Sequence, residues 1–195
     1  MKKNELDILI PVYNEDEIII DTIKNILSAV KSDYRIVICY DYEEDPTLKI
    51  IKENFPNNTK IFFIKNFSKG FNKAIISGFR NSSAQATIIF MADDHLNHNL
   101  IDLCYEKFNE GYDVVCPSRF IKGGKMIGNP ILKALLTRLV SFFLYHFTSF
   151  PIKDSTNSFR LFSKKLIDDV QIESNEGFTL SLELTAKAHR RGYKI

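Results

Sequence analysis

Acidic side chains occur in three short segments that each follow an apolar run of the sequence. The segments are 11–15, 41–45 and 92–95. If the apolar runs are parallel strands of one sheet, these segments meet at its carboxyl edge, where open α/β sheets bind ligands. Carboxylates that repel one another are costly to gather unless a cation or hydrogen-bond donors lie between them. The pattern therefore predicts a divalent-metal site at this edge of the sheet.

Basic side chains follow in the second half of the chain. The cations there include Arg119, Lys122, Lys125, Lys133 and Arg138. Arginine holds phosphate through a bidentate fork, whereas lysine acts as a point charge. Neither G-x-G-x-x-G nor G-x-x-x-x-G-K-[ST] occurs, which argues against a dinucleotide dehydrogenase and a P-loop nucleotidase. We therefore expect any diphosphate to be held by metal and cationic side chains.

The elements that must position these residues follow from the apolar periodicity. Short apolar runs alternate with longer helical periods, which is typical of α/β layering around a mostly parallel sheet. The expected strands are 6–10, 34–40, 60–64, 86–91 and 113–117, and the expected helices are 15–30, 46–54, 70–81, 100–110, 130–147 and 178–191. We expect one domain, in which residues 1–117 bind a ligand and residues 118–195 add a second wall.

Two of the expected helices have recognisable start signals. Asn14 and Glu17 have the spacing of a capping box, so the first helix is expected to begin beside Asn14. Pro46 suits the first position of the second helix. The acidic residues before it, 43–45, are expected to be a solvated helix start.

Composition excludes several classes of protein. The 195 residues carry 26 Lys and Arg against 24 Asp and Glu, and the resulting net charge of +2 gives no support for nucleic-acid binding. The content of 45% apolar and 26% charged residues is that of a globular protein. Three cysteines without a C-x-x-C pair predict reduced, mostly buried thiols in a cytosolic domain, with no zinc site and no disulfide.

No segment is long and apolar enough for a signal peptide or a membrane-spanning helix. The most apolar stretch, 139–150, is expected to form a core helix or to present an apolar surface to lipid. The sequence stops at 191–195, where a strand is expected to start, so we expect a C-terminal truncation.

Seven motifs, in order along the whole chain, resemble those of the family-2 glycosyltransferases of A-type fold. They are Pro11-Val12-Tyr13-Asn14-Glu15, Asp41 with Asp45-x-Thr47, Lys69-Gly70 with Gly78-Phe79, Met91-Ala92-Asp93, Ser118 to Gly124, Lys153-Asp154-Ser155-Thr156 with Phe159-Arg160, and Gly177-Phe178 with Glu183-Leu184. The last three resemble the dolichol- or polyprenol-phosphate sugar transferases within that family. The resemblance implies a Rossmann-like A-type domain whose first 117 residues bind a nucleotide sugar and whose remainder binds the acceptor.

On the donor side, the resemblance implies that Pro11, Tyr13 and Glu15 frame the base and ribose of a nucleotide sugar. Asp41 would contact the nucleoside, and Lys69 would also bind substrate. These assignments come from matching motif positions.

The implied metal is Mn²⁺ or Mg²⁺, which would offset the charge that grows on the departing diphosphate. The family's Asp-x-Asp motif falls on Met91-Ala92-Asp93, so its first aspartate is absent here. His95 stands where the polyprenol-phosphate branch has a further metal-binding glutamine, and imidazole favours manganese over magnesium. Asp93 and His95 are therefore the implied ligands.

On the acceptor side, Arg119, Lys133 and Arg138 match positions that hold the acceptor phosphate. Asp154 and Arg160 match later acidic and basic positions of the active site. Asp93, Arg119 and Asp154 are thus the implied catalytic residues, and the resemblance implies transfer to polyprenyl phosphate with inversion at the anomeric carbon. It also implies a cytoplasmic enzyme of cell-envelope synthesis at the inner face of the membrane.

Two other functions remain open on the sequence. The acceptor could be a sugar hydroxyl of a surface polysaccharide, in which case Asp154 is the candidate general base. Alternatively, Met91 could mark a degenerate nucleotide-binding protein that has lost turnover with the first metal aspartate.

Overall fold

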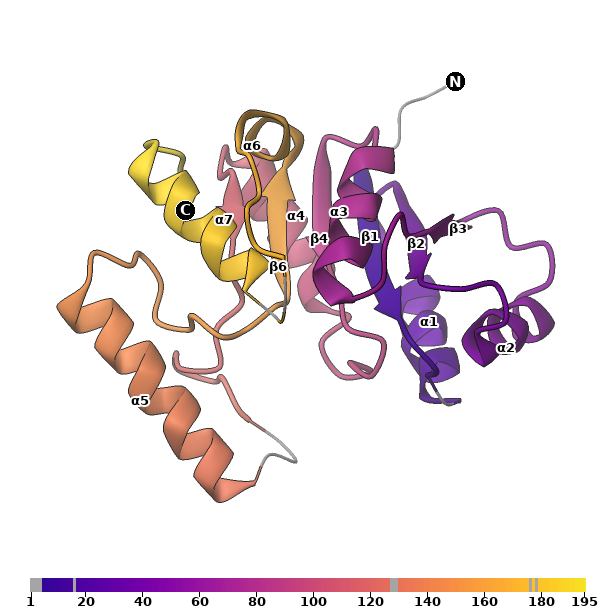
Figure 1. The fold of residues 1–195 in the computed structure, drawn as a ribbon, viewed down its shortest axis with the longest axis horizontal. Coiled ribbons are helices and arrows are strands. Elements are labelled where there is room, and N and C mark those ends of the chain that lie inside the picture. The colour runs from indigo at the N-terminus through magenta and orange to yellow at the C-terminus, as the bar shows by residue number, and fades with distance from the viewer. Residues whose placement is uncertain (1–4, 16, 127–129, 176, 178) are drawn as a thin grey trace.

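The computed structural model describes residues 5–15, 17–126, 130–175, 177 and 179–195. Strands and helices alternate through most of the chain (Figure 1). In chain order the elements are β1 (Leu6–Val12), α1 (Ile18–Ala29), β2 (Tyr34–Tyr40), α2 (Pro46–Asn54), β3 (Ile61–Lys65), α3 (Phe71–Asn81), β4 (Ala86–Ile89), α4 (Leu100–Asn109), β5 (Val114–Val115), α5 (Ile131–Phe147), β6 (Arg160–Ser163), α6 (Lys164–Asp169) and α7 (Leu180–Arg190).

The strands form one six-stranded sheet in the order β3-β2-β1-β4-β6-β5. The pairings of β1 with β2, of β1 with β4 and of β2 with β3 are parallel. β6 runs antiparallel to both of its neighbours, β4 and β5. This arrangement confirms the expected α/β class and the mostly parallel sheet, and it places the ends of β1, β2 and β4 at one edge.

Helices cover both faces of the sheet, because the central strands are apolar on both sides. β1 is buried along its whole length. Its alternate residues Leu6 and Ile8 contribute to a core shared with α1, α2 and α4, whereas Leu9 contributes to a core shared with α3, α6 and α7. Cys39 and Cys104 are buried, as the sequence predicts, and Cys116 is half-buried.

Two local expectations are wrong. α1 begins at Ile18, and Glu17 in the cap position makes no side-chain cap hydrogen bond. Asn14 instead adopts a left-handed φ of 53°, and its side-chain oxygen accepts a hydrogen bond from the Tyr42 hydroxyl. The capping box predicted for Asn14 and Glu17 is therefore absent, because a tertiary contact has taken the asparagine. After residue 158 the sequence predicts only unspecified short elements before the last helix, and the structure has β6 and α6 there.

α5 lies apart from the sheet, at the lower left of Figure 1. Ser141 is its one buried residue. Its ten large exposed apolar side chains are Ile131, Leu132, Leu135, Leu136, Leu139, Val140, Phe142, Phe143, Tyr145 and Phe147. The core-helix interpretation of this stretch is therefore wrong. Among the described residues, no helix combines the length and the apolarity that crossing a bilayer requires.

Candidate active site

The loop after β1 is held by the start of α2. Asp45 accepts the Thr47 amide through one carboxylate oxygen, at 2.9 Å, and the Asn14 amide through the other, at 3.1 Å. The Thr47 hydroxyl accepts the Glu15 amide at 2.8 Å. Asp45 is 2% exposed, so its carboxylate is buried, and each of its oxygens accepts one backbone amide. The expectation that it belongs to a solvated helix start is wrong, since one carboxylate both caps α2 and fixes the loop of the first motif.

We call the hydrogen bonds that join Asp45 and Thr47 to Asn14 and Glu15 the Asp45 clasp. An aromatic pair lies beside it. Tyr13 is 61% exposed, and its ring meets the ring of Tyr42 edge-on with centroids 6.0 Å apart. An exposed aromatic ring at a sheet edge can stack on a planar base. Tyr42 was not among the predicted site residues. Pro11, two residues before Tyr13, is buried within β1, so it supports the loop and is not exposed to a ligand.

Asp41 connects the end of β2 to the loop before α3. One of its oxygens accepts the Asn66 side-chain amide at 2.7 Å and the other accepts the Gly70 amide at 3.1 Å. Gly70 has a φ of +113°, a backbone conformation that residues with a Cβ rarely adopt. Lys69 beside it is exposed. The structure thus brings Asp41, Lys69 and Gly70 together beside the predicted donor loop.

The loop after β4 carries the predicted metal ligands. The Asp94 carboxylate is already used within the loop, because it accepts hydrogen bonds from the Leu96 and Asn97 backbone amides and from the Asn97 side-chain amide. Asp93 is exposed, and within the part of the chain that the structure describes its hydrogen bonds are made by its backbone carbonyl rather than by its carboxylate. The His95 ring nitrogen Nδ1 lies 3.3 Å from the Asp93 carbonyl oxygen. Within the described residues, no three metal-binding side chains are grouped.

This donor set fits a metal that takes its remaining ligands from a substrate. Magnesium in particular is commonly bound by one or two carboxylates together with substrate phosphates and water. Asp93 offers such a carboxylate at the sheet edge, and His95 is its neighbour in the same loop.

Arg119 forms the central ion pair of the second half. Its Nε and Nη2 donate to the two Asp154 carboxylate oxygens at 2.8 and 2.7 Å, and its backbone amide donates to Asp154 at 2.9 Å. Nη2 also donates to the Thr156 hydroxyl at 2.6 Å. The Asp154 side chain is 1% exposed and that of Arg119 is 26% exposed. Burial raises the pKa of Asp154, but the hydrogen bonds and charge of Arg119 outweigh it and leave the pKa below its ordinary value.

Arg160 lies beneath this pair and is fully buried. It donates to the backbone carbonyls of Asp154 and Ser155, at 3.1 and 2.7 Å, and on its other side to Ser181 and Thr185 of α7. Burial lowers the pKa of its guanidinium. Its contacts support a role in holding the 154–155 segment, since no part of its side chain is exposed to a substrate.

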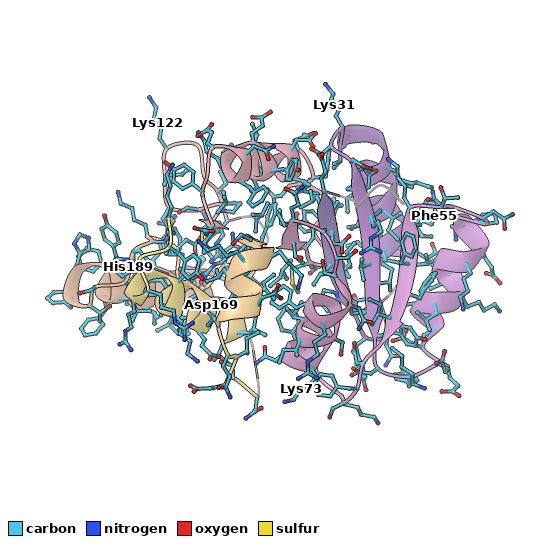
Figure 2. The ribbon with its side chains drawn as sticks, turned by 90° about the horizontal axis from the view of Figure 1, so that it is seen from above. Lys31, Phe55, Lys73, Lys122, Asp169 and His189 are labelled. Atoms are coloured by element: carbon cyan, nitrogen blue, oxygen red, sulfur yellow. The ribbon has the colours of Figure 1, made fainter. Side chains whose placement is uncertain are left out.

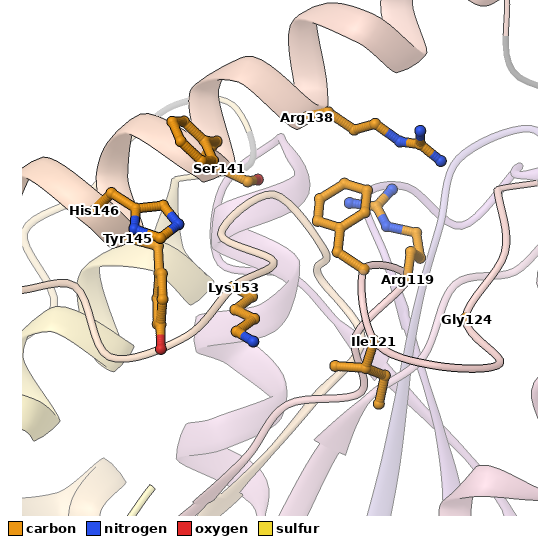
Figure 3. Close-up of a pocket in the computed structure, with 10 residues that line it drawn as sticks. Arg119, Ile121, Gly124, Arg138, Ser141, Tyr145, His146 and Lys153 are labelled. Atoms are coloured by element: carbon orange, nitrogen blue, oxygen red, sulfur yellow. The ribbon is translucent and has the colours of Figure 1, made fainter.

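A pocket of about 480 Å³ separates the 119–124 loop from α5 (Figure 3). Its cations are Arg119, Arg138 and Lys153. Both arginines lie near the Phe120 ring, whose centroid is 5.5 Å from the guanidinium carbon of Arg119 and 5.9 Å from that of Arg138. The predicted acceptor residues Arg119 and Arg138 therefore share one pocket.

The other predicted cations lie elsewhere. Lys133 lines an apolar groove with Leu132, Leu136 and Thr156. Lys122 points outward from the tip of its loop (Figure 2). Gly124 closes the same loop, and a Cβ there would lie 2.7 Å from the Arg119 backbone, so only glycine fits without displacing Arg119.

The chain matches the family model described as glycosyl transferase family 2 over residues 7–171. It belongs to that family. Relatives within reach of sequence comparison include the putative glycosyltransferase CsbB of Bacillus subtilis, 28% identical over 173 residues, and a dolichol-phosphate mannosyltransferase of Pyrococcus furiosus, 25% identical over 188 residues. These matches cover 86% and 94% of this chain but 51% and 53% of the relatives, so the chain spans about half their length.

Solved structures agree with the family-2 fold. Glucosyl-3-phosphoglycerate synthase from Mycobacterium tuberculosis, in complex with Mn²⁺, UDP and glucosyl-3-phosphoglycerate, superposes with a TM-score of 0.68 at 14% identity. The superposition covers 96% of this chain and 66% of that one. It confirms the predicted A-type glycosyltransferase fold.

Replacing Asp45 should test the clasp of the donor loop. Asp45→Ala removes a helix cap and frees the Asn14 amide, so we expect a loss of about 1–3 kcal/mol in the free energy of unfolding. Urea unfolding followed by circular dichroism measures it. Glu44→Ala, an exposed neighbour, is the matched control and should change stability by less than about 0.5 kcal/mol. Equal effects of the two substitutions would contradict the clasp.

Glu183 gives a pH-dependent test of the loop before α7. It accepts the Glu173 and Ser174 amides, both at 2.7 Å, and pairs with Lys187. Burial raises the pKa of Glu183, but these hydrogen bonds outweigh it and lower the pKa from 4.5 to about 2. A carboxylate whose pKa is lower in the folded state than in the unfolded state stabilises the fold at any pH above the unfolded-state pKa. This stabilisation is lost as the pH falls through the folded-state pKa.

Glu183→Gln should therefore cost about 2–3 kcal/mol at pH 7, and its deficit relative to the native chain should shrink between pH 4.5 and 2. Parallel urea titrations across that range provide the measurement. A deficit that stays constant with pH would show that the charge of Glu183 is not what stabilises the loop.

Proposed function

We propose that this family-2 chain transfers a sugar from a nucleoside diphosphate to a polyprenyl phosphate at a membrane surface. The observation that carries the proposal is the pocket that Arg119, Arg138 and Lys153 share beneath the exposed apolar surface of α5. A lipid phosphate has the two parts that this arrangement suits, an anionic head and an apolar chain. The mannosyltransferase from Pyrococcus, whose name includes dolichol phosphate, supports this acceptor.

The donor side of the proposal rests on the loops at the ends of β1, β2 and β4. Tyr13 offers an exposed ring for the base, and Asp41 and Glu15 lie at the neighbouring loops. Asp93 and His95 would hold Mn²⁺ or Mg²⁺. Structures of the mycobacterial synthase contain UDP with either ion, which supports a uridine nucleotide and a divalent metal here. When bound, such a metal offsets the negative charge of the leaving diphosphate.

The chain's own residues account for the acceptor's part in the reaction. An acceptor phosphate is already anionic, so its oxygen can attack the anomeric carbon without a strong general base. Arg119 and Arg138 would bind the phosphate and aim it, which lowers the barrier through orientation. A single displacement from the face opposite the diphosphate inverts the anomeric centre.

No observation favours a hydroxyl acceptor over a phosphate. That chemistry needs a base near neutrality, whereas Asp154 is buried, chelated by Arg119 and has a lowered pKa. The retention of Asp93 at the sheet edge likewise gives no support to a degenerate nucleotide-binding protein.

Charge and exposure together support the proposed association with a membrane surface. The stretch from Ser118 to Lys153 contains six Lys and Arg and no Asp or Glu, and it includes the apolar α5. Cationic segments beside an exposed apolar helix bind anionic bilayer interfaces. We therefore place α5 at the interface of an anionic leaflet, and the cytoplasmic leaflet suits this charge.

Donor binding can be measured without turnover. A thermal-shift screen of UDP- and GDP-sugars, with and without Mn²⁺, should give a metal-dependent rise in Tm for the cognate donor, because a ligand of the folded state stabilises it. Asp93→Asn should abolish most of the metal-dependent part. Asp33→Asn, an exposed aspartate elsewhere, is the control. A shift that is the same in the native chain and in Asp93→Asn would remove Asp93 from the metal site.

Membrane docking is tested by flotation with vesicles of phosphatidylglycerol and phosphatidylcholine. The native chain should float with these vesicles at low salt and bind pure phosphatidylcholine more weakly. Leu135→Glu with Phe143→Glu should weaken binding at least about tenfold, since each side chain loses roughly 1.5–3 kcal/mol of apolar burial. Leu103→Glu, on the exposed face of α4, is the control. Undiminished flotation of the double variant would contradict docking through α5.

A further inference from the structure

The segment Asp154–Thr156 contacts every element that surrounds the pocket. Asp154 and Thr156 bind the Arg119 guanidinium from the loop after β5. Ser155 lies 3.0 Å, oxygen to oxygen, from Ser141 of α5. Three consecutive residues thus connect the two walls of the pocket, which otherwise come from distant parts of the sequence.

Arg160 fixes this segment to the body of the protein. Nη2 donates to the carbonyls of Asp154 and Ser155, while Nη1 donates to Ser181 and Thr185 of α7. The side chain is fully buried, and Nε has no hydrogen-bond partner among the described residues. A buried guanidinium with one unsatisfied donor is expensive. The hydrogen bonds of Arg160 therefore hold the backbone of this segment against α7, and none of them reaches into the pocket.

The Ser141–Ser155 hydrogen bond is the polar anchor of α5. Ser141 is the one buried residue of that helix, and both hydroxyls are enclosed by protein. Arg138 precedes Ser141 by three residues, nearly one helical turn, so both lie on the same side of the helix. The depth at which Ser141 seats therefore sets how far Arg138 stands from Arg119.

We propose that Ser141 and Ser155 are positioning residues, which with Arg160 set the separation of Arg119 and Arg138 to match the acceptor phosphate. Asp154 orients one arginine and Ser155, the next residue, locates the helix that carries the other. The inference rests on the proposed function for the identity of the acceptor. The linkage between the two pocket walls does not depend on that identity.

The contact between the two pocket walls can be tested without substrate by double electron–electron resonance. This method measures the distance between spin labels placed at Glu106→Cys on α4 and Phe143→Cys on α5. Burial raises the pKa of Cys39 and Cys104 to about 12 and also raises the pKa of Cys116. The buried Cys39 and Cys104 therefore react slowly with the label, and the half-buried Cys116 is replaced by alanine in every sample. Ser155→Ala should shift or broaden the distance distribution. Ser28→Ala, which removes an exposed helical hydroxyl on α1, should leave it unchanged.

The consequence for acceptor binding is measured with farnesyl phosphate as the acceptor probe. Ser141→Ala and Ser155→Ala should each raise the acceptor KM about threefold to tenfold, the worth of one buried hydrogen bond, while the KM for the donor stays constant. The double variant should be no worse than either single variant, because both substitutions remove the same bond. General loss of stability would raise neither KM selectively.

The outcomes separate the two proposals. An unchanged distance distribution in Ser155→Ala overturns the positioning role, whichever acceptor is used. A changed distribution with an unaltered acceptor KM also overturns it. If the native chain transfers no sugar to any polyprenyl phosphate, the proposed function fails, and the distance distribution still decides whether Ser141 and Ser155 hold the walls together.

Discussion

A carboxylate that is removed from water must find hydrogen-bond donors or a cation, and this constraint organises both sides of the candidate site. On the proposed nucleotide-sugar side, Asp45 is buried and accepts hydrogen bonds from the adjacent Thr47 and from the distant Asn14. On the proposed acceptor side, Asp154 is buried and accepts them from the distant Arg119. In each case at least one hydrogen-bond donor comes from a loop distant in sequence, so satisfying one buried charge fixes the position of that loop. The geometry of the site is thus a consequence of charge burial.

α5 departs from the rule that organises the rest of the fold. The sheet is covered by helices on both faces, whereas α5 leaves most of its apolar side chains in contact with solvent. A helix that is apolar on several faces forms stably in proteins only when something covers it. Its one buried residue is a serine, and a serine–serine hydrogen bond and cation–ring contacts join it to the body. Such an attachment leaves most of the apolar surface of α5 available to a lipid interface.

The sequence predicts this fold where local signals agree with tertiary contacts. The bounds of α2 and β2 match expectation, because Pro46 starts the helix and an unbroken apolar run defines the strand. β6 could not be predicted, since four residues beginning with Arg160 become a strand only by pairing with β4 and β5. The same holds for the site. Family motifs locate Asp41, Arg119 and Asp154. The pairing of Asp41 with Asn66 and that of Arg119 with Asp154 were not predicted, because they join residues 25 and 35 positions apart. The role of Asn14 was not predicted for the same reason, because its side chain accepts a hydrogen bond from Tyr42, which is distant in sequence.

The charge balance of the pocket favours an anionic acceptor over a neutral one. Arg119, Arg138 and Lys153 line it. Asp154 compensates for part of the charge of Arg119, but Arg160 lies directly behind Asp154 and returns the local balance to positive. Two arginines also lie against one aromatic ring, an arrangement in which like charges repel unless an anion comes between or beside them. A phosphate would relieve that repulsion and gain bidentate hydrogen bonds. A sugar hydroxyl would leave it in place, so the electrostatics of the pocket and the lowered pKa of Asp154 point to the same class of acceptor.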